Sequence, residues 1–206
     1  MDIFLSDDNK AVIALTVIGQ ARNYIPYLTI ALQRAGEQGI GRKRTPFAME
    51  KITHEGKTFD YSIENVEKKS LFWPDAIGMQ NLGTIILDSP CRIKKAAHYL
   101  QTIYVDDLLL AAQRHMYILD RLYGDGRFSI QELPNHSSIP VDQHWIDQNY
   151  YSSRQHTHMK IGGVVGKIEL KNSLDQYSYE LLEACRLFHV GKNISMGLGR
   201  ILLMRR

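Results

Sequence analysis

Apolar and polar residues follow one another along the chain with two different spacings, which predict a mixture of strands and helices. Short apolar runs and alternating segments predict strands at 11–18, 47–57, 84–87, 145–151, 160–170 and 201–204. Apolar positions three and four residues apart predict helices at 21–35, 105–123 and 177–188. Strands and helices in this succession indicate an α+β fold.

The order of these elements divides the chain into two related parts. Residues 82–206 show the order β-α-β-β-α-β, which is that of a ferredoxin-like (RRM-like) unit. Residues 1–60 show only β-α-β, half of such a unit, and the polar segment 61–81 is predicted to link the two. The fold class is therefore α+β with tandem ferredoxin-like units, of which the first is incomplete. An incomplete unit leaves a sheet edge uncovered, so we expect either a larger first domain or a homodimer.

The composition restricts the class of protein. The 206 residues are 44% apolar and 23% charged, which is ordinary for a globular protein. No apolar run is long enough to span a membrane, and the N-terminus lacks the features of a signal peptide. The two cysteines, Cys91 and Cys185, are far apart in sequence, which suits the reducing cytoplasm and predicts no disulfide framework.

The net charge of +3 is small, but the basic residues are clustered. One cluster is Arg42-Lys43-Arg44, and a second is formed by Arg92, Lys94 and Lys95. Residues 186–206 contain five basic residues and no acidic one. Three such clusters could follow a polyanion such as a nucleic acid. The alternative is that each cluster is an ordinary solvated surface.

The segment His189–Arg200 is rich in glycine and precedes a predicted strand. Gly191, Gly197 and Gly199 permit backbone conformations that admit a phosphate group, and Lys192 and Arg200 supply positive charge. It is not a nucleotide-binding P-loop, because asparagine follows the lysine and Arg186 occupies the place of the first glycine. The alternative is a turn that is needed only for folding.

Arg154, His156 and His158 are separated by single residues, so in a strand they would share one face. Two histidines and an arginine on one face could serve as acid, base and phosphate clamp. The alternative is a polar or RNA-contacting face without catalysis. A zinc site at the two histidines would need further ligands, and none is nearby in sequence, so we predict no metal and no cofactor.

Three segments, in this order, resemble motifs of the RAMP superfamily of CRISPR proteins. The closest resemblance is to the repeat-processing endoribonuclease, the sixth CRISPR-associated family. The matching motifs lie in residues 15–47, with Gly39-Ile-Gly-Arg-Lys-Arg44, in residues 150–166, with Gly162-Gly-Val-Val-Gly166, and in residues 189–200.

The resemblance implies that the chain binds CRISPR repeat RNA and cuts it without metal, through attack of a ribose 2′-hydroxyl on the adjacent phosphate. The residues expected to carry the reaction are Arg154, His156 and His158. The residues expected to bind RNA are Arg42, Lys43, Arg44, Gly191, Lys192, Ser195, Gly197, Gly199 and Arg200.

Members of this family usually carry another ferredoxin half-domain before the first strand seen here, and in several members it holds the catalytic histidine. The resemblance therefore leaves a second hypothesis, a catalytically inactive RNA-binding subunit of a CRISPR ribonucleoprotein complex. A third hypothesis is a ferredoxin-like protein-interaction domain with no RNA role. The expected partners are repeat RNA and other CRISPR effector subunits, with no membrane partner.

Overall fold

The computed structural model describes residues 2–5, 10–40, 43–54, 57–59, 82–152 and 156–206, and the chain divides into two compact units. One unit comprises residues 17–72, and the other comprises residues 1–16 and 73–206. In the described part of the chain, no helix is long and apolar enough to cross a membrane.

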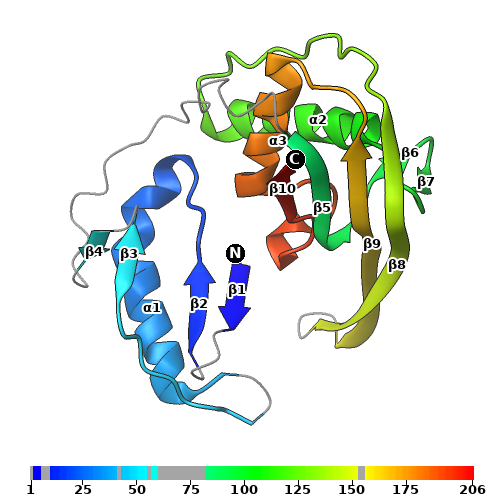
Figure 1. Cartoon of the computed structure of the whole chain (residues 1–206). Coiled ribbons are helices and arrows are strands. Elements are labelled where there is room, and N and C mark those ends of the chain that lie inside the picture. Colours follow the sequence, from blue (N-terminus) through cyan, green and yellow to red (C-terminus); the bar gives the residue numbers. More distant parts are fainter. Residues whose placement is uncertain (1, 6–9, 41–42, 55–56, 60–81, 153–155) are drawn as a thin grey trace. The chain divides into compact units, whose positions relative to one another are not determined.

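Residues 82–206 contain a four-stranded antiparallel sheet and two helices (Figure 1). The elements are β5 (Leu82–Cys91), α2 (Val105–Tyr123), β8 (Ser138–Ser152), β9 (Thr157–Leu170), α3 (Gln176–Phe188) and β10 (Ile201–Arg205). The strand order in the sheet is β10-β5-β9-β8, so the first and third strands lie in the middle. Apart from a short hairpin between β5 and α2, these elements follow the predicted β-α-β-β-α-β order.

The helices pack with one face of this sheet around a single apolar core. Alternate residues of β5 and β9 point into it, among them Ile85, Leu87, Val164 and Ile168, each at most 1% exposed. Helix α3 adds Leu181, as the apolar spacing predicts, and also its neighbour Leu182. Burying each such side chain stabilises the fold by about 1.5–3 kcal/mol.

Strand β8 is interrupted by a bulge between Val141 and His144, and the bulge fixes the segment that enters α2. The side-chain amide of Gln143 accepts a hydrogen bond from the N–H of Ile103 (2.8 Å) and donates one to the carbonyl of Ile103 (2.9 Å). It donates a second to the carbonyl of Lys167 (3.1 Å). One side chain therefore joins β8, β9 and the start of α2.

A short hairpin lies between β5 and α2. Its strands are β6 (Lys94–Lys95) and β7 (His98–Tyr99), joined by a two-residue turn. The turn residues Ala96 and Ala97 have φ of 46° and 69°, a left-handed conformation that favours glycine or asparagine. The sequence pattern predicts no strand here.

The N-terminal elements differ from the predicted β-α-β order, because a pair of strands precedes the helix and a second pair follows it along the chain. They are β1 (Asp2–Leu5), β2 (Ala11–Ala14), the 3-10 helix η1 (Gly19–Tyr24), α1 (Ile25–Gln38), β3 (Ile52–His54) and β4 (Lys57–Phe59). Strand β2 pairs with β1 and β3 pairs with β4. The predicted strand at 11–18 is too long, because its pairing ends where Ala14 lies opposite Asp2. The predicted linker 61–81 lies outside the described residues.

Candidate functional site

In the glycine-rich loop between α3 and β10, other backbone segments pass close to two of the glycines. Gly191, Gly197 and Gly199 have φ of 98°, 83° and 77°. A Cβ atom at Gly199 would lie 1.9 Å from the carbonyl oxygen of Val190, and one at Gly191 would lie 2.7 Å from that of Arg92. On the side where a Cβ would stand, the space at these two glycines is therefore filled by the chain's own backbone, which explains why both positions are glycine.

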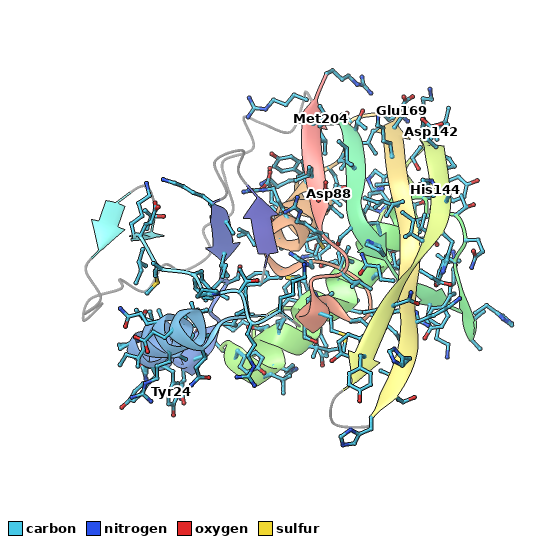
Figure 2. The ribbon with its side chains drawn as sticks, turned by 90° about the horizontal axis from the view of Figure 1, so that it is seen from below. Tyr24, Asp88, Asp142, His144, Glu169 and Met204 are labelled. Carbon is cyan, nitrogen blue, oxygen red and sulfur yellow. The ribbon has the colours of Figure 1, made fainter. Side chains whose placement is uncertain are left out.

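A bulged segment of β5 holds the end of this loop. The Ser89 hydroxyl donates to the carbonyl of Gly197 (3.0 Å) and accepts from the N–H of Arg200 (2.9 Å). The Arg200 guanidinium forms an ion pair with Asp88 (Nε to Oδ2, 2.7 Å), which Figure 2 labels beside the sheet. The loop presents the exposed side chains of Lys192, Ser195 and Met196 to solvent.

Two histidines fix the start of the same loop. The buried His189 donates from Nδ1 to the carbonyl of Leu198 (3.0 Å), and His115 donates from Nδ1 to the carbonyl of His189 (3.1 Å). Burial lowers the pKa of His115, an effect that outweighs the opposing hydrogen bond to the His189 carbonyl. Both rings therefore serve the loop structure.

The predicted arrangement of Arg154, His156 and His158 on one strand is wrong. His158 lies in β9, but His156 lies in the turn of the β8–β9 hairpin with φ of 49°, and Arg154 lies outside the described residues. A chain that reverses direction at the turn cannot continue the alternation of a strand. His156 and His158 are both exposed, so they are accessible to a ligand.

The β8–β9 hairpin extends beyond the end of β5, as Figure 1 shows. On its extension, Tyr151 lies opposite His158 with their ring centroids 4.9 Å apart, and Asn149 lies opposite Lys160. These four residues share one face because of the strand register, and all are exposed. An aromatic ring, an imidazole and an ammonium group on one face suit contacts with bases and phosphates.

The sheet face opposite the helices has a different composition. By register it carries Thr84, Ile86, Ile139, Val141, Lys167, Glu169, Leu202 and Met204. Figure 2 labels Glu169 and Met204 of this set. None of these eight residues is aromatic, although stacking aromatic residues are what an RRM-type sheet uses to bind bases. The β8–β9 extension is therefore the better candidate for base contacts.

The predicted basic cluster at residues 42–44 lies after α1, in the other compact unit. Lys43 and Arg44 are exposed in a turn that an Ile40–Thr45 bridge closes, and Arg44 has φ of 46°. Arg42 lies outside the described residues. The turn presents two cationic side chains to solvent.

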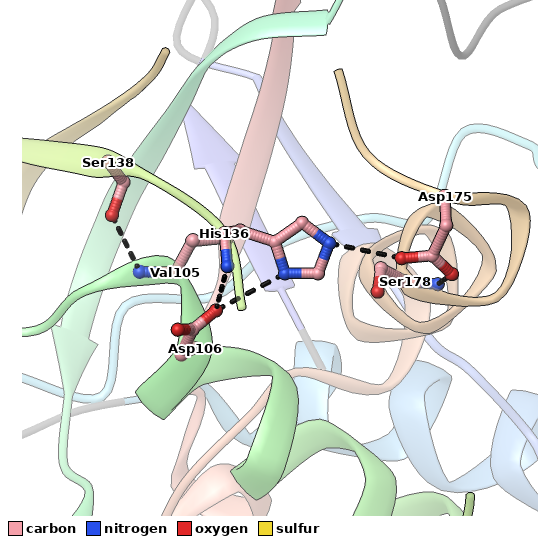
Figure 3. Close-up of polar contacts among 6 residues, drawn as sticks. All are labelled: Val105, Asp106, His136, Ser138, Asp175 and Ser178. Carbon is pink, nitrogen blue, oxygen red and sulfur yellow. Dashed lines mark hydrogen bonds and ion pairs between the residues drawn. The ribbon is translucent and has the colours of Figure 1, made fainter. Parts of the chain in front are cut away.

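His136, which has no other candidate catalytic residue beside it in the sequence, makes three polar contacts to two aspartates (Figure 3). Its Nδ1 and backbone N–H contact Asp106 (3.2 and 3.1 Å), and its Nε2 contacts Asp175 (3.0 Å). Asp175 also caps α3 by accepting from the N–H of Ser178. Burial raises the pKa of Asp175, but hydrogen bonds from Ser178 and His136 outweigh burial and lower it overall. With its ring 6% exposed, His136 joins two helix starts and is not open to a substrate.

Cysteine chemistry and metal binding find no support in the described residues. Cys91 and Cys185 are free and fully buried, and burial raises the pKa of Cys91 to about 12, which keeps its thiol protonated at neutral pH. Within the described ranges, no three His, Cys, Asp or Glu side chains gather as a metal site.

Solved structures similar to this chain are Cas6 proteins, at low identity. A Cas6 product complex shares 12% identity with a TM-score of 0.38, covering 59% of this chain and 50% of that chain. A Thermus thermophilus Cas6 shares 11% identity with a TM-score of 0.38, covering 61% and 54%. A partial Cas6-RT-Cas1–Cas2 complex shares 17% with a TM-score of 0.44, covering 63% and 23%. The chain thus spans about half the length, or less, of these relatives.

Comparison with curated proteins gives no match. Family models match in two places. Residues 3–72 match the N-terminal domain model AF_1859_N. Residues 85–201, more than half of the 206 residues, match the model of CRISPR-associated endoribonuclease Cas6. This segment includes the glycine-rich loop and the β8–β9 hairpin, and its match shows that the chain belongs to the Cas6 family.

Proposed function

We propose that this protein binds CRISPR repeat RNA and takes part in its processing. The observation that carries the proposal is the match of residues 85–201 to the Cas6 endoribonuclease model. Within this segment the exposed groups suited to RNA are Lys192 on the glycine-rich loop and the Tyr151–His158 face of the β8–β9 hairpin. Other CRISPR effector subunits are the proposed protein partners.

The proposed reaction is metal-independent cleavage. A base takes the proton of the ribose 2′-hydroxyl, whose oxygen attacks the adjacent phosphorus. An acid protonates the departing 5′-oxygen, leaving a 2′,3′-cyclic phosphate and a 5′-hydroxyl. Exposed imidazoles at His156 and His158 supply candidates for base and acid, and a cation such as Arg154 stabilises the charge of the phosphorane.

The second candidate function is RNA binding without cleavage. In the part of the chain that the structure describes, no hydrogen bond orients the ring of His156 or His158, and the recorded contact of His158 is the Tyr151 ring. An acid–base pair is usually held in place by a third group. This observation favours a binding subunit whose catalytic groups lie elsewhere.

The test is a cleavage assay in EDTA with RNA transcribed from a CRISPR repeat. If the hairpin carries the reaction, His156→Ala or His158→Ala lowers the cleavage rate by about 10²-fold or more while RNA affinity changes little. His144→Ala, an exposed histidine at the β8 bulge, is the matched control and keeps the parent rate. Binding without cleavage by the parent protein supports the second candidate, and absence of binding excludes both.

We further propose that residues 1–60 form an incomplete ferredoxin-like unit, joined by 61–81 to a ferredoxin-like domain at 82–206. The order of elements supports this arrangement, because α1 lies between the strand pairs β1–β2 and β3–β4 along the chain. Limited proteolysis tests it: cleavage within 61–81 that leaves a folded 82–206 fragment is expected. A fragment that unfolds without residues 1–16, which group with 73–206 as one compact unit, would contradict these boundaries. Homodimer formation is tested by mass measurement in solution.

A further inference from the structure

The β6–β7 hairpin brings together basic side chains that the proposed function has not used. Lys94 and His98 are exposed on its two strands. Lys95 is also exposed, but its ammonium group is paired with Asp107 at 2.6 Å. The charge of Lys94 is therefore available to a ligand, whereas that of Lys95 is largely neutralised.

Arg92, just before the hairpin, is an arginine stacked on an aromatic ring. Its guanidinium carbon lies 4.0 Å from the centroid of the Tyr99 ring. Its Nε is buried without a hydrogen-bond partner, and among the described residues no carboxylate pairs with it. A guanidinium held flat on an aromatic ring has a fixed plane and keeps terminal N–H groups for a planar or tetrahedral anion.

The stack is supported from β8. The Trp145 ring lies 6.4 Å from Tyr99, centroid to centroid, and donates from Nε1 to Asp147 (2.7 Å). This ring packing fixes the direction of Tyr99 and, through it, of Arg92. Preorganised cations of this kind lose little entropy when an anion binds.

The glycine-rich loop reaches the same place from the other end of the chain. The backbone N–H of Lys192 donates to the carbonyl of Arg92 (2.9 Å), and Gly191 is in contact with that carbonyl. The backbone of Lys192, whose side chain is exposed, therefore lies beside Arg92. Lys94 follows Arg92 by two positions in the sequence. One backbone hydrogen bond thus joins the segment of Arg92 and Lys94 to Lys192, about a hundred positions later in the sequence.

The turn that presents the hairpin is strained. Ala96 and Ala97 both adopt left-handed φ values, a conformation that costs a residue with a Cβ roughly 1–2 kcal/mol. Residues held in such a conformation cluster at active sites and ligand-binding sites.

We propose that Arg92, Lys94 and Lys192 form one surface that binds consecutive backbone phosphates of RNA. This inference rests on the proposed function and names a contact region for the same partner. Arg92 contributes a planar, directional clamp for one phosphate, and the two lysines contribute flexible charges for its neighbours. Contacts of this kind position an RNA without reading its sequence.

The test measures binding of a fluorescently labelled single-stranded RNA oligonucleotide over a series of salt concentrations. Lys94→Gln removes one exposed charge without disturbing a recorded contact. Losing one phosphate contact is expected to make the slope of log affinity against log salt shallower by about 0.7. Arg92→Gln is expected to weaken binding about tenfold, as loss of a hydrogen bond to a charged group does. Arg92→Lys distinguishes the effect of charge from that of geometry, because lysine keeps the positive charge but lacks the planar guanidinium that stacks on Tyr99.

The matched control is Lys171→Gln, an exposed lysine just after β9 at the far end of the sheet, which keeps the parent affinity and slope. Thermal unfolding of each variant shows whether it is folded.

If Lys94→Gln keeps the parent affinity and slope in a folded protein that binds RNA, this inference is wrong and the proposed function stands. If the parent protein does not bind RNA, both are wrong. Displacement of the RNA by polyglutamate at equal charge would indicate an acidic protein partner and overturn the proposal.

Discussion

The glycine-rich loop and the β6–β7 hairpin meet at Arg92, yet they adopt left-handed backbone conformations for different reasons. In the loop, such a conformation at Gly199 is accompanied by a carbonyl oxygen 1.9 Å from where a Cβ would stand. In the hairpin, Ala96 and Ala97 adopt it while carrying a Cβ. The loop is therefore fixed by close backbone packing, whereas the hairpin turn keeps two alanines in a conformation that residues with a Cβ disfavour. Only the loop should depend on glycine to fold.

The largest effect expected from this difference is at Gly199. Gly199→Ala should cost about 3 kcal/mol or more in the free energy of unfolding, because a Cβ meets the Val190 carbonyl in addition to the unfavourable φ. Urea unfolding followed by circular dichroism measures this cost. Gly126→Ala is the matched control: its φ is 70°, but its Cβ would lie 3.6 Å from the nearest recorded atom, so about 1 kcal/mol is expected. Equal costs at the two positions would remove the packing argument.

The next effect concerns binding and not folding. Lys192 is exposed on the rigid loop, so Lys192→Gln should leave the free energy of unfolding within about 0.5 kcal/mol of the parent. RNA affinity should fall roughly fivefold, with a weaker dependence on salt. Filter binding and thermal unfolding on the same samples check both values. Unchanged affinity would leave the loop with a folding role alone.

A smaller gain is expected in the hairpin turn. Ala97→Gly relieves left-handed strain but adds freedom to the unfolded chain, so a net stabilisation of about 0.5 kcal/mol is expected. Ala111→Gly in α2 is the opposite control and should destabilise by about 1 kcal/mol, since its backbone is helical. A loss of stability at Ala97 would mean that the turn is not strained.

The smallest expected effect is a pH dependence of stability that differs between the glycine-rich loop and the β6–β7 hairpin. His115 supports the loop through the His189 carbonyl, and its pKa lies below the ordinary 6.5 because of burial. As the pH falls below 6.5, the unfolded chain takes up this proton before the folded one, so the contribution of His115 to stability decreases. Amide exchange should therefore accelerate in the loop on acidification, and less so in the hairpin. His115→Gln should remove this difference; acceleration that persists in the variant would assign it to another group.

How far the sequence predicts this structure depends on the kind of element. Helices α2 and α3 are predicted almost residue for residue, because burial of one face imposes the helical spacing. The β6–β7 hairpin is missed, since two residues per strand show no alternation and its Ala-Ala turn lacks the Asn-Gly type of signal.

The candidate site shows the same limit. No glycine, proline, asparagine or aspartate occurs between Ser152 and Thr157, so the alternation of Arg154, His156 and His158 gives no warning of the turn. The glycines at 191 and 199 are visible in the sequence, but the groups that approach them come from Arg92 and Val190. The sequence therefore indicates where the backbone requires glycine, but the approaching groups are identified only in the folded structure. The Arg92–Tyr99 stack is likewise visible only in the fold.

The amide of Gln143 has a consequence for the chemical ageing of the protein. Its nitrogen donates to the carbonyls of Ile103 and Lys167, and its oxygen accepts from the Ile103 N–H. Deamidation would replace that nitrogen by a second oxygen and leave two carbonyls facing a carboxylate without a donor. Hydrolysis of this one amide, which consumes a water and releases ammonia, would thus loosen the junction of β8, β9 and α2.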